Sequence, residues 1–188
     1  MRIFLMECTL LLVLGMAVCF TTCKSEATAQ VAEKHSHNPE AILDSMGITL
    51  PVIAPPIANY VNVTQAGKLL FLAGKGPKDA SGTYITGKLG KDLTVEEGYE
   101  AARKVGIMQI AVLKDHLGDL SKVKRILKVK GMVNATPDFT QHPEVINGFS
   151  DCMVEVFGDA GKHARAAVGM GSLPRNICVE IDMVVELH

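Results

Sequence analysis

The sequence predicts an α+β domain in which helices pack on one face of a sheet. Runs of alternating apolar residues, typical of strands, are separated by two segments with apolar residues at helical spacing. The resulting order is strands, helix, strand, helix and two strands, which suits one layer of helices over one sheet. With 188 residues, 48% hydrophobic and 21% charged, the chain can bury one sizeable core.

The first elements are a short helix and a hairpin. Asn38 can cap a helix that ends at Gly47, and several prolines then impose an extended connection. Strands at 60–64 and 69–73, joined by a glycine turn, make the hairpin, and a further short strand is expected at 83–86.

A long amphipathic helix is expected from Thr94 to Gly118. Thr94 and Glu97 form a capping box, and apolar residues then recur at helical spacing. Gly106 costs about 1 kcal/mol relative to alanine in mid-helix. We expect that it lets the helix lie close against the sheet.

A strand at 123–133 and a second helix from about Pro143 lead to residues 163–187, the most informative stretch. This stretch is interpreted as two strands joined by a Ser-Leu-Pro turn. Glu180 lies opposite a continuous apolar face, and Arg165 also points away from its apolar neighbours. A guanidinium and a carboxylate on neighbouring strands could bind a small carboxylate. From spacing alone, a cross-strand or surface ion pair is the simpler interpretation.

The same stretch resembles the C-terminal signature of the Rid/YjgF family, the reactive-intermediate (enamine/imine) deaminases. The similarity covers roughly residues 48–188, and the Gly-Ile-Thr-Leu-Pro segment from Gly47 to Pro51 resembles a longer subgroup of that family. It implies a chorismate-mutase-like fold with a mixed sheet, and a homotrimer with sites at the subunit interfaces. The motifs that carry it are Ala58-Asn-Tyr60-Val61, Leu72-Ala-Gly74-Lys-Gly76, Leu93-Thr94-Val-Glu-Glu97, Val145-Ile-Asn147-Gly148, Ala164-Arg165-Ala-Ala-Val168-Gly, Leu173-Pro174 and Val179-Glu180-Ile181.

The resemblance assigns two catalytic roles. Arg165 matches the family arginine that clamps the substrate carboxylate, and Glu180 matches the acid that positions or deprotonates the attacking water. The implied reaction is hydrolysis of small 2-imino or 2-enamino acids to 2-keto acids and ammonia. This chemistry requires no metal and no cofactor.

Four further residues match pocket positions of the family: Tyr60, Ala73, Asn147 and Ala167. Tyr60 and Asn147 can equally be a strand aromatic and a helix-start residue. Ala73 stands where many active members have serine, and Ala167 where they have cysteine, so a different or bulkier substrate is expected. These two departures also motivate an alternative, a non-catalytic member that binds small carboxylates.

A third possibility, endoribonuclease activity, rests only on the basic residues within 122–130. They interleave with apolar residues and lack stacking aromatics, so a solvated strand face is the better interpretation. The formal net charge of −1 likewise favours no nucleic-acid partner.

The N-terminus predicts export to the periplasm or the exterior. Residues 1–29 are interpreted as a signal peptide cleaved before Gln30, followed by a linker and short helix at 30–47 and the domain at 48–188. The apolar run of 13 residues is shorter than the roughly 18 needed to span a bilayer, so no membrane contact is expected after cleavage. A lipid anchor at Cys23 is the alternative. In the mature chain, Cys152 and Cys178 are expected to be buried free thiols.

Overall fold

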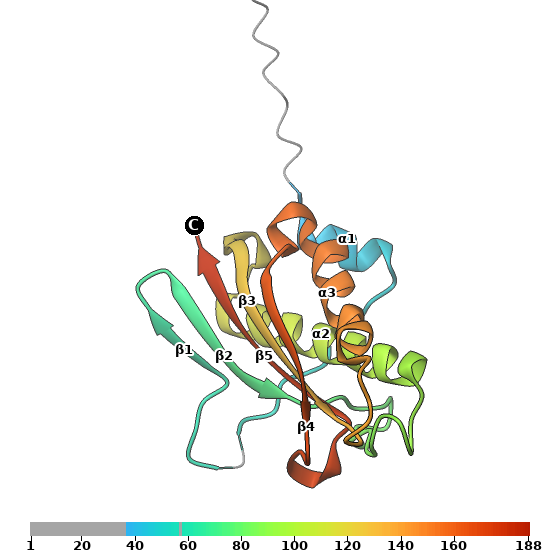
Figure 1. Cartoon of the computed structure of the whole chain (residues 1–188). Coiled ribbons are helices and arrows are strands. Elements are labelled where there is room, and N and C mark those ends of the chain that lie inside the picture. Colours follow the sequence, from blue (N-terminus) through green and yellow to red (C-terminus); the bar gives the residue numbers. More distant parts are fainter. Residues whose placement is uncertain (1–36, 57) are drawn as a thin grey trace, which may run out of the picture. The chain divides into compact units, whose positions relative to one another are not determined.

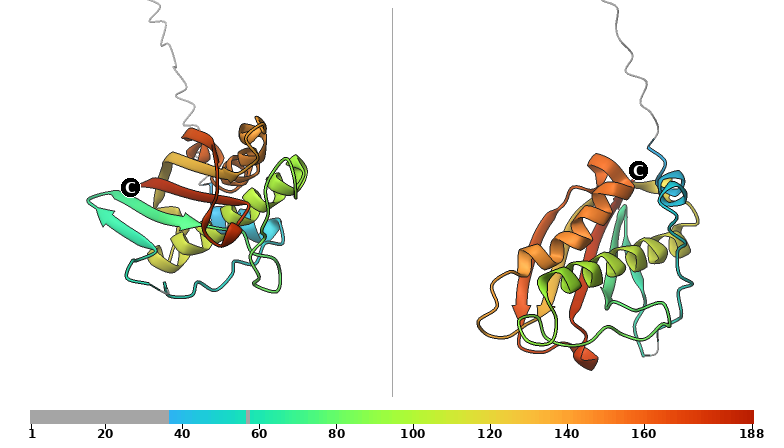
Figure 2. Two further views of the ribbon diagram at one scale, coloured as in Figure 1. Left: turned by 60° about the horizontal axis from the view of Figure 1, so that its bottom comes forward. Right: turned by 90° about the vertical axis from the view of Figure 1, so that its right-hand side faces the viewer.

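The computed structural model describes residues 37–56 and 58–188, and shows a five-stranded sheet with helices on one face (Figures 1 and 2). The strand order is β1-β2-β5-β3-β4, with β3 and β4 parallel and the other pairs antiparallel. The α+β class, the mixed sheet and the helices on one face are therefore confirmed. The elements are α1 (Pro39–Ser45), β1 (Val63–Ala66), β2 (Leu69–Lys75), α2 (Val95–Leu117), η1 (Leu120–Lys122), β3 (Val123–Asn134), α3 (His142–Phe157), η2 (Gly158–Gly161), β4 (Ala164–Met170), η3 (Pro174–Asn176) and β5 (Val179–Leu187).

The expected signal peptide, its cleavage before Gln30 and the alternative lipid anchor at Cys23 lie outside the described residues. Export and the boundaries at 29 and 47 therefore stay predictions. Within the described residues, no helix is both long and apolar enough to cross a membrane.

The helix ends follow their local sequence signals. The side chain of Asn38 accepts hydrogen bonds from the backbone of Glu40 and Ala41, at 3.0 and 3.2 Å. Thr94 and Glu97 form the expected capping box, and Gly118 ends α2 in the left-handed conformation, with φ 74°. These elements needed only local information, and their prediction is confirmed.

The role expected for Gly106 is wrong in one respect: the residue faces α3, and not the sheet. A Cβ atom there would lie 3.1 Å from the Cys152 sulfur. Gly148 lies one turn before Cys152 in α3, and a Cβ atom there would overlap the backbone carbonyl of Tyr99 in α2. The two glycines therefore allow α2 and α3 to approach each other closely.

The interpretation of the C-terminal stretch as two adjacent strands is also wrong. β3 lies between β4 and β5, and the segment 171–178 carries the chain past the end of β3. Within this segment Arg175 and Asn176 both adopt left-handed backbone conformations. The expected strand at 83–86 is reduced to isolated bridges, of which Thr86 with Ile177 is one.

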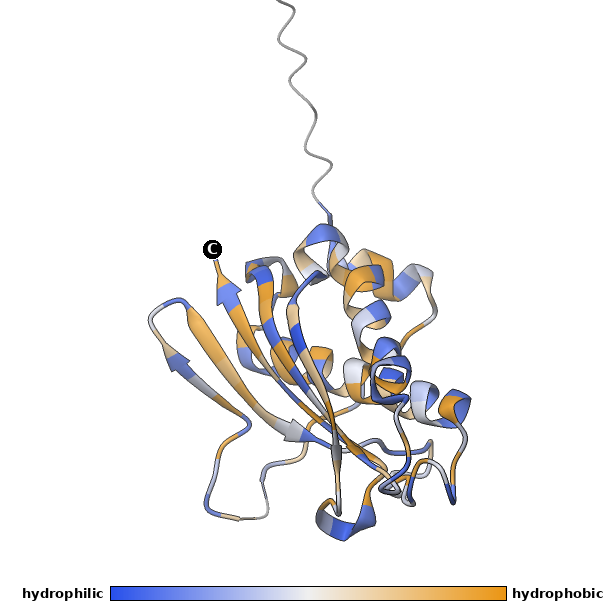
Figure 3. Ribbon diagram, viewed as in Figure 1, coloured by the Kyte–Doolittle hydropathy of each residue, from blue (hydrophilic) through white to orange (hydrophobic). Residues whose placement is uncertain are grey.

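Apolar and polar residues alternate along the central strands β3 and β5 (Figure 3). Val179, Ile181, Met183 and Val185 are buried on the helix-facing side. Glu180 therefore lies on the opposite side, which we call the open face. The lysines and the arginine of 122–130 are exposed, as predicted.

Cys152 and Cys178 are both buried and free, which confirms the expectation for these thiols. Burial raises the pKa of each thiol to about 11. Both sulfurs therefore act as core atoms and not as nucleophiles.

Candidate active site

The two residues with expected catalytic roles lie on opposite faces of the sheet. Glu180 lies on the open face of β5, opposite Met132 of β3. Arg165 of the edge strand β4 pairs in register with Val129 of β3, which is buried against the helices. The two residues form no ion pair, so both a one-chain site with these residues on adjacent strands and the simple ion-pair alternative are wrong.

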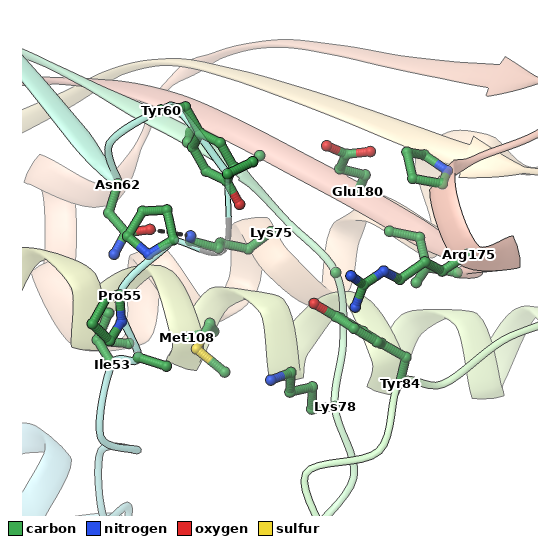
Figure 4. A pocket seen from close by; sticks show the side chains of 18 of the residues that line it. Ile53, Pro55, Tyr60, Asn62, Lys75, Lys78, Tyr84, Met108, Arg175 and Glu180 are labelled. Carbon is green, nitrogen blue, oxygen red and sulfur yellow. Dashed lines mark hydrogen bonds between the residues drawn. The ribbon is translucent and has the colours of Figure 1, made fainter.

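The other predicted site residues divide in the same way. Tyr60 and Ala73 line a cavity of about 680 Å³ together with Glu180 (Figure 4). Asn147 contacts Arg165 from α3, and Ala167 lies two residues further along β4 on the same face as Arg165. We call these sets the Glu180 half and the Arg165 half.

A β-bulge shapes the Glu180 half. The register between β2 and β5 shifts between Leu72 and Lys75, so Ala73 and Gly74 together oppose one residue of β5. Gln109, fully buried on α2, donates hydrogen bonds to the carbonyls of Ala73 and Ile181, at 3.0 and 2.8 Å. Its amide thus pairs with backbone acceptors where the ladder is irregular.

The bulge places a glycine under the carboxylate of Glu180. A Cβ atom on Gly74 would overlap Glu180 Oε1 and would lie 3.1 Å from both Cγ and Cδ. Only glycine leaves that space free. Burial raises the pKa of Glu180, with a further rise from the charge of Asp182 and an opposing effect from Lys130. A carboxylate with a raised pKa is better suited to exchange a proton with water near neutral pH.

The Arg165 half is held by a chain of hydrogen bonds. Arg165 Nη1 donates to Asn147 Oδ1 and to Ser150 Oγ, each at 2.9 Å. Ser150 Oγ lies 3.1 Å from His163 Nε2, and His163 Nδ1 lies 2.6 Å from the Gly161 carbonyl oxygen. A carbonyl only accepts, so Nδ1 carries the proton, and Nε2 of the neutral ring accepts from the serine hydroxyl.

Burial also lowers the pKa of His163, and the charge of Arg165 lowers it further. The neutral ring is therefore favoured, and it leaves the serine oxygen free to accept from the arginine. Arg165 is consequently fixed at the β4 edge of the sheet with its guanidinium oriented by α3.

Sequence reasoning missed several residues of these two halves. Gln109 could have been found from the sequence, because it is a polar residue at a position that the helical spacing of α2 places among the buried residues. Ser150 and His163 carried none, because only the fold brings α3 beside the start of β4. In the described part of the chain no three His, Cys, Asp or Glu side chains are grouped to hold a metal ion.

Comparison with known proteins places this geometry in a family. Residues 40–187 match the family described as "YjgF/chorismate mutase-like, putative endoribonuclease". Protein TCP17 of Trypanosoma cruzi is 44% identical over 149 residues, which cover 79% of this chain and 93% of that protein.

Solved structures agree. The protein Atu1372 from Agrobacterium tumefaciens is 42% identical, with a TM-score of 0.74 over 81% of this chain and 96% of its own. A "putative endoribonuclease" from Shewanella oneidensis is 34% identical, with a TM-score of 0.76 over 80% of this chain and 99% of its own. The family resemblance seen in the sequence is therefore confirmed, and the chain belongs to the YjgF/chorismate mutase-like family.

Proposed function

We propose that the protein hydrolyses small 2-imino or 2-enamino acids to 2-keto acids and ammonia, at a site that two copies of the chain complete together. The observation that carries the proposal is the division of the site residues. Each half is preorganised by its own contacts, yet Arg165 and Glu180 lie on opposite faces of one sheet. A second copy can bring an Arg165 half to a Glu180 half.

The chemistry suits these two groups. A 2-imino acid carries a planar carboxylate beside an electrophilic carbon, and a guanidinium can bind that carboxylate through two parallel hydrogen bonds. Glu180 accepts a proton from water as the water oxygen bonds to the carbon of the protonated imine, and it then returns this proton to the nitrogen of the resulting amino alcohol. Ammonia leaves as the hydroxyl group gives up its proton, and the 2-keto acid remains. Water supplies the carbonyl oxygen, so the reaction balances without a redox partner.

The open face supports an assembly, for which we propose a homotrimer. Phe71 and Val168 lie on this face with 45% and 38% of their surface exposed. No helix of the described residues lies over this face, and exposed apolar side chains on an uncovered sheet face are places where a partner subunit can pack. Light scattering at micromolar concentration tests this: a monomeric mass with full activity would contradict a shared site.

The experiment for the activity is imine turnover by an Arg165→Ala variant, with an amino-acid oxidase generating the imine. Loss of the carboxylate clamp should lower the rate about 100-fold or more while the protein stays folded. Lys104→Ala is the control, because Lys104 is an exposed cation on α2 that belongs to neither half and does not lie on the open face. An unchanged rate in the Arg165→Ala variant would overturn the assignment.

A second candidate function is binding without turnover, favoured by Ala73 and Ala167. It predicts saturable binding of 2-keto acids that depends on Arg165, with no imine hydrolysis above background. Endoribonuclease activity has weaker support, since Lys124 and Arg125 of the basic strand already pair with Glu186. RNA binding that is absent, or that does not weaken with salt, would argue against it.

A further inference from the structure

We propose that the cavity beside Glu180 contains a second anion subsite, built around Lys78 and Arg175, which selects 2-imino acids with an oxyanion at the far end of their chain. The proposal rests on the function proposed above, because Glu180 marks where the reacting carbon lies. Carboxylate and phosphate share the chemistry that this subsite would recognise.

The charge of the cavity is the first argument. Three cations line it, Lys75, Lys78 and Arg175, and Glu180 is the single acidic residue among the described lining residues. No carboxylate of residues 37–56 and 58–188 lies within 4.0 Å of any of the three cations. Like charges gathered around one cavity repel each other, and an anion bound between them would relieve that repulsion.

Tyr84 holds two of these cations in place. Lys78 Nζ lies 5.1 Å from the centroid of the Tyr84 ring, and Arg175 Cζ lies 5.5 Å from it. Cations are attracted to the face of an aromatic ring at such distances. Figure 4 shows both charged groups beside Tyr84, with the Glu180 carboxylate at the other side of the cavity.

The third cation is fixed by a different contact. Lys75 Nζ lies 2.5 Å from Asn62 Oδ1, and burial, with the charge of Lys78, lowers the pKa of Lys75. Lys75 therefore already has a polar partner. The two cations on Tyr84 are the better candidates for direct contact with a ligand.

The backbone at Arg175 is the second argument. Arg175 has φ 56° and ψ 20°, a left-handed conformation that costs a residue with a side chain about 1–2 kcal/mol. Such strained residues concentrate at functional sites, where the surrounding structure enforces them. Here the strain presents the guanidinium to the cavity.

The buried side chain of Asn134 holds the turn that contains Arg175 in this conformation. Asn134, fully buried at the end of β3, donates to the Gly87 carbonyl at 3.3 Å and to Asn176 Oδ1 at 3.0 Å. Lys88 Nζ donates to Asn134 Oδ1 at 2.9 Å. The turn that carries Arg175 is thus tied to the core through its neighbour Asn176.

The size and the apolar wall of the cavity are the third argument. In a single chain the cavity has a volume of about 680 Å³, more than an imino acid of three or four carbons fills, and the partner's Arg165 half would occupy part of it. Ile53, Pro55 and Met108 supply apolar surface in the same cavity. A substrate with a methylene spacer and a terminal oxyanion matches apolar wall and cationic end together.

The test compares ligands of equal backbone length. Calorimetry measures binding of 2-oxoglutarate and of 2-oxopentanoate, which are the products of a dicarboxylic and a monocarboxylic imino acid. We expect 2-oxoglutarate to bind at least roughly tenfold more tightly at low salt, with the ratio falling as salt rises. A third ligand, 2-oxo-4-phosphonobutanoate, distinguishes a carboxylate-selective from a phosphate-selective subsite.

Two variants carry the test to the residues. Lys78→Met removes one charge, and Arg175→Asn removes the other with a residue that tolerates the left-handed conformation. In each variant, the ratio of the affinity for 2-oxoglutarate to the affinity for 2-oxopentanoate should fall towards one. Lys68→Met is the matched control, since Lys68 is an exposed lysine in the turn at the other end of β2. It should keep the wild-type ratio.

The outcomes separate this proposal from the function on which it rests. Turnover of monocarboxylic imines with no preference for 2-oxoglutarate would overturn the subsite and leave the deaminase in place. A preference that depends on Lys78 and Arg175, in a protein with no imine turnover, would support the subsite and overturn the deaminase. Equal ratios in the wild type and both variants would overturn the subsite in every case.

Discussion

Replacing Gly74 with alanine should separate the position of Glu180 from the stability of the fold. The added Cβ would overlap Glu180 Oε1 and would lie 3.1 Å from Cγ and Cδ of that side chain. The carboxylate must therefore move by about 1 Å, a displacement that can cost about 100-fold in rate. Because the obstacle is the flexible end of a partly buried side chain, the free energy of unfolding should fall by only about 1 kcal/mol.

The assay is kcat/KM for imine hydrolysis, measured beside the free energy of unfolding in denaturant. Gly171→Ala is the matched control, because a Cβ at Gly171 meets nothing within 4 Å and its φ is not in the left-handed region. A Gly74→Ala variant with wild-type kcat/KM would refute the reasoning that Glu180 acts from the position above the bulge. A variant that unfolds instead would show that the contact is structural.

Two further predictions concern the stability of the β-bulge and the pH dependence of Glu180. Gln109→Leu removes two buried hydrogen bonds and should lower the free energy of unfolding by about 2–4 kcal/mol. Gln141→Leu is the control, because Gln141 is exposed and its side chain makes no cap hydrogen bond, so the free energy of unfolding should change by less than about 0.5 kcal/mol. Equal losses of stability in the two variants would refute the role of Gln109. Since burial and Asp182 raise the pKa of Glu180, the folded state binds more protons there than the unfolded state, so this group's contribution to stability falls as pH rises through the raised pKa. Catalysis needs the deprotonated base, so kcat/KM should rise as pH rises through the raised pKa of Glu180. Asp182→Asn removes a charge that raises this pKa and should therefore shift the rise in kcat/KM to lower pH. An unshifted pH profile would count against Glu180 as the base.

Local sequence signals were sufficient for the helices but not for the sheet. The capping box at Thr94 and the left-handed Gly118 act within a few residues, so α2 could be predicted from its own segment. The order of strands depends on which segments pair across long separations. Nothing in residues 163–187 indicates that β3 inserts between β4 and β5, because strands that follow each other in the sequence need not be neighbours in the sheet.

The candidate site shows the same limit. The residue types of Arg165 and Glu180 indicated carboxylate binding and proton transfer, and the family resemblance supplied their roles. Alternation placed each residue on one side of its own strand, but it could not relate the faces of two strands with a third between them. The bulge that sets Gly74 beneath Glu180 depends on Gln109 from α2, a contact that only the folded chain creates.

Mixing two inactive variants tests the shared site most directly. Arg165→Ala and Glu180→Gln chains should each be inactive alone. When the two chains are coexpressed in equal amounts and assemble at random, about a quarter of all interfaces would join an intact Glu180 half to an intact Arg165 half. We expect recovery of about that fraction of wild-type activity, and mass spectrometry verifies that mixed assemblies have formed. Mixed assemblies that stay as inactive as the separate variants would contradict a site built from two copies of the chain.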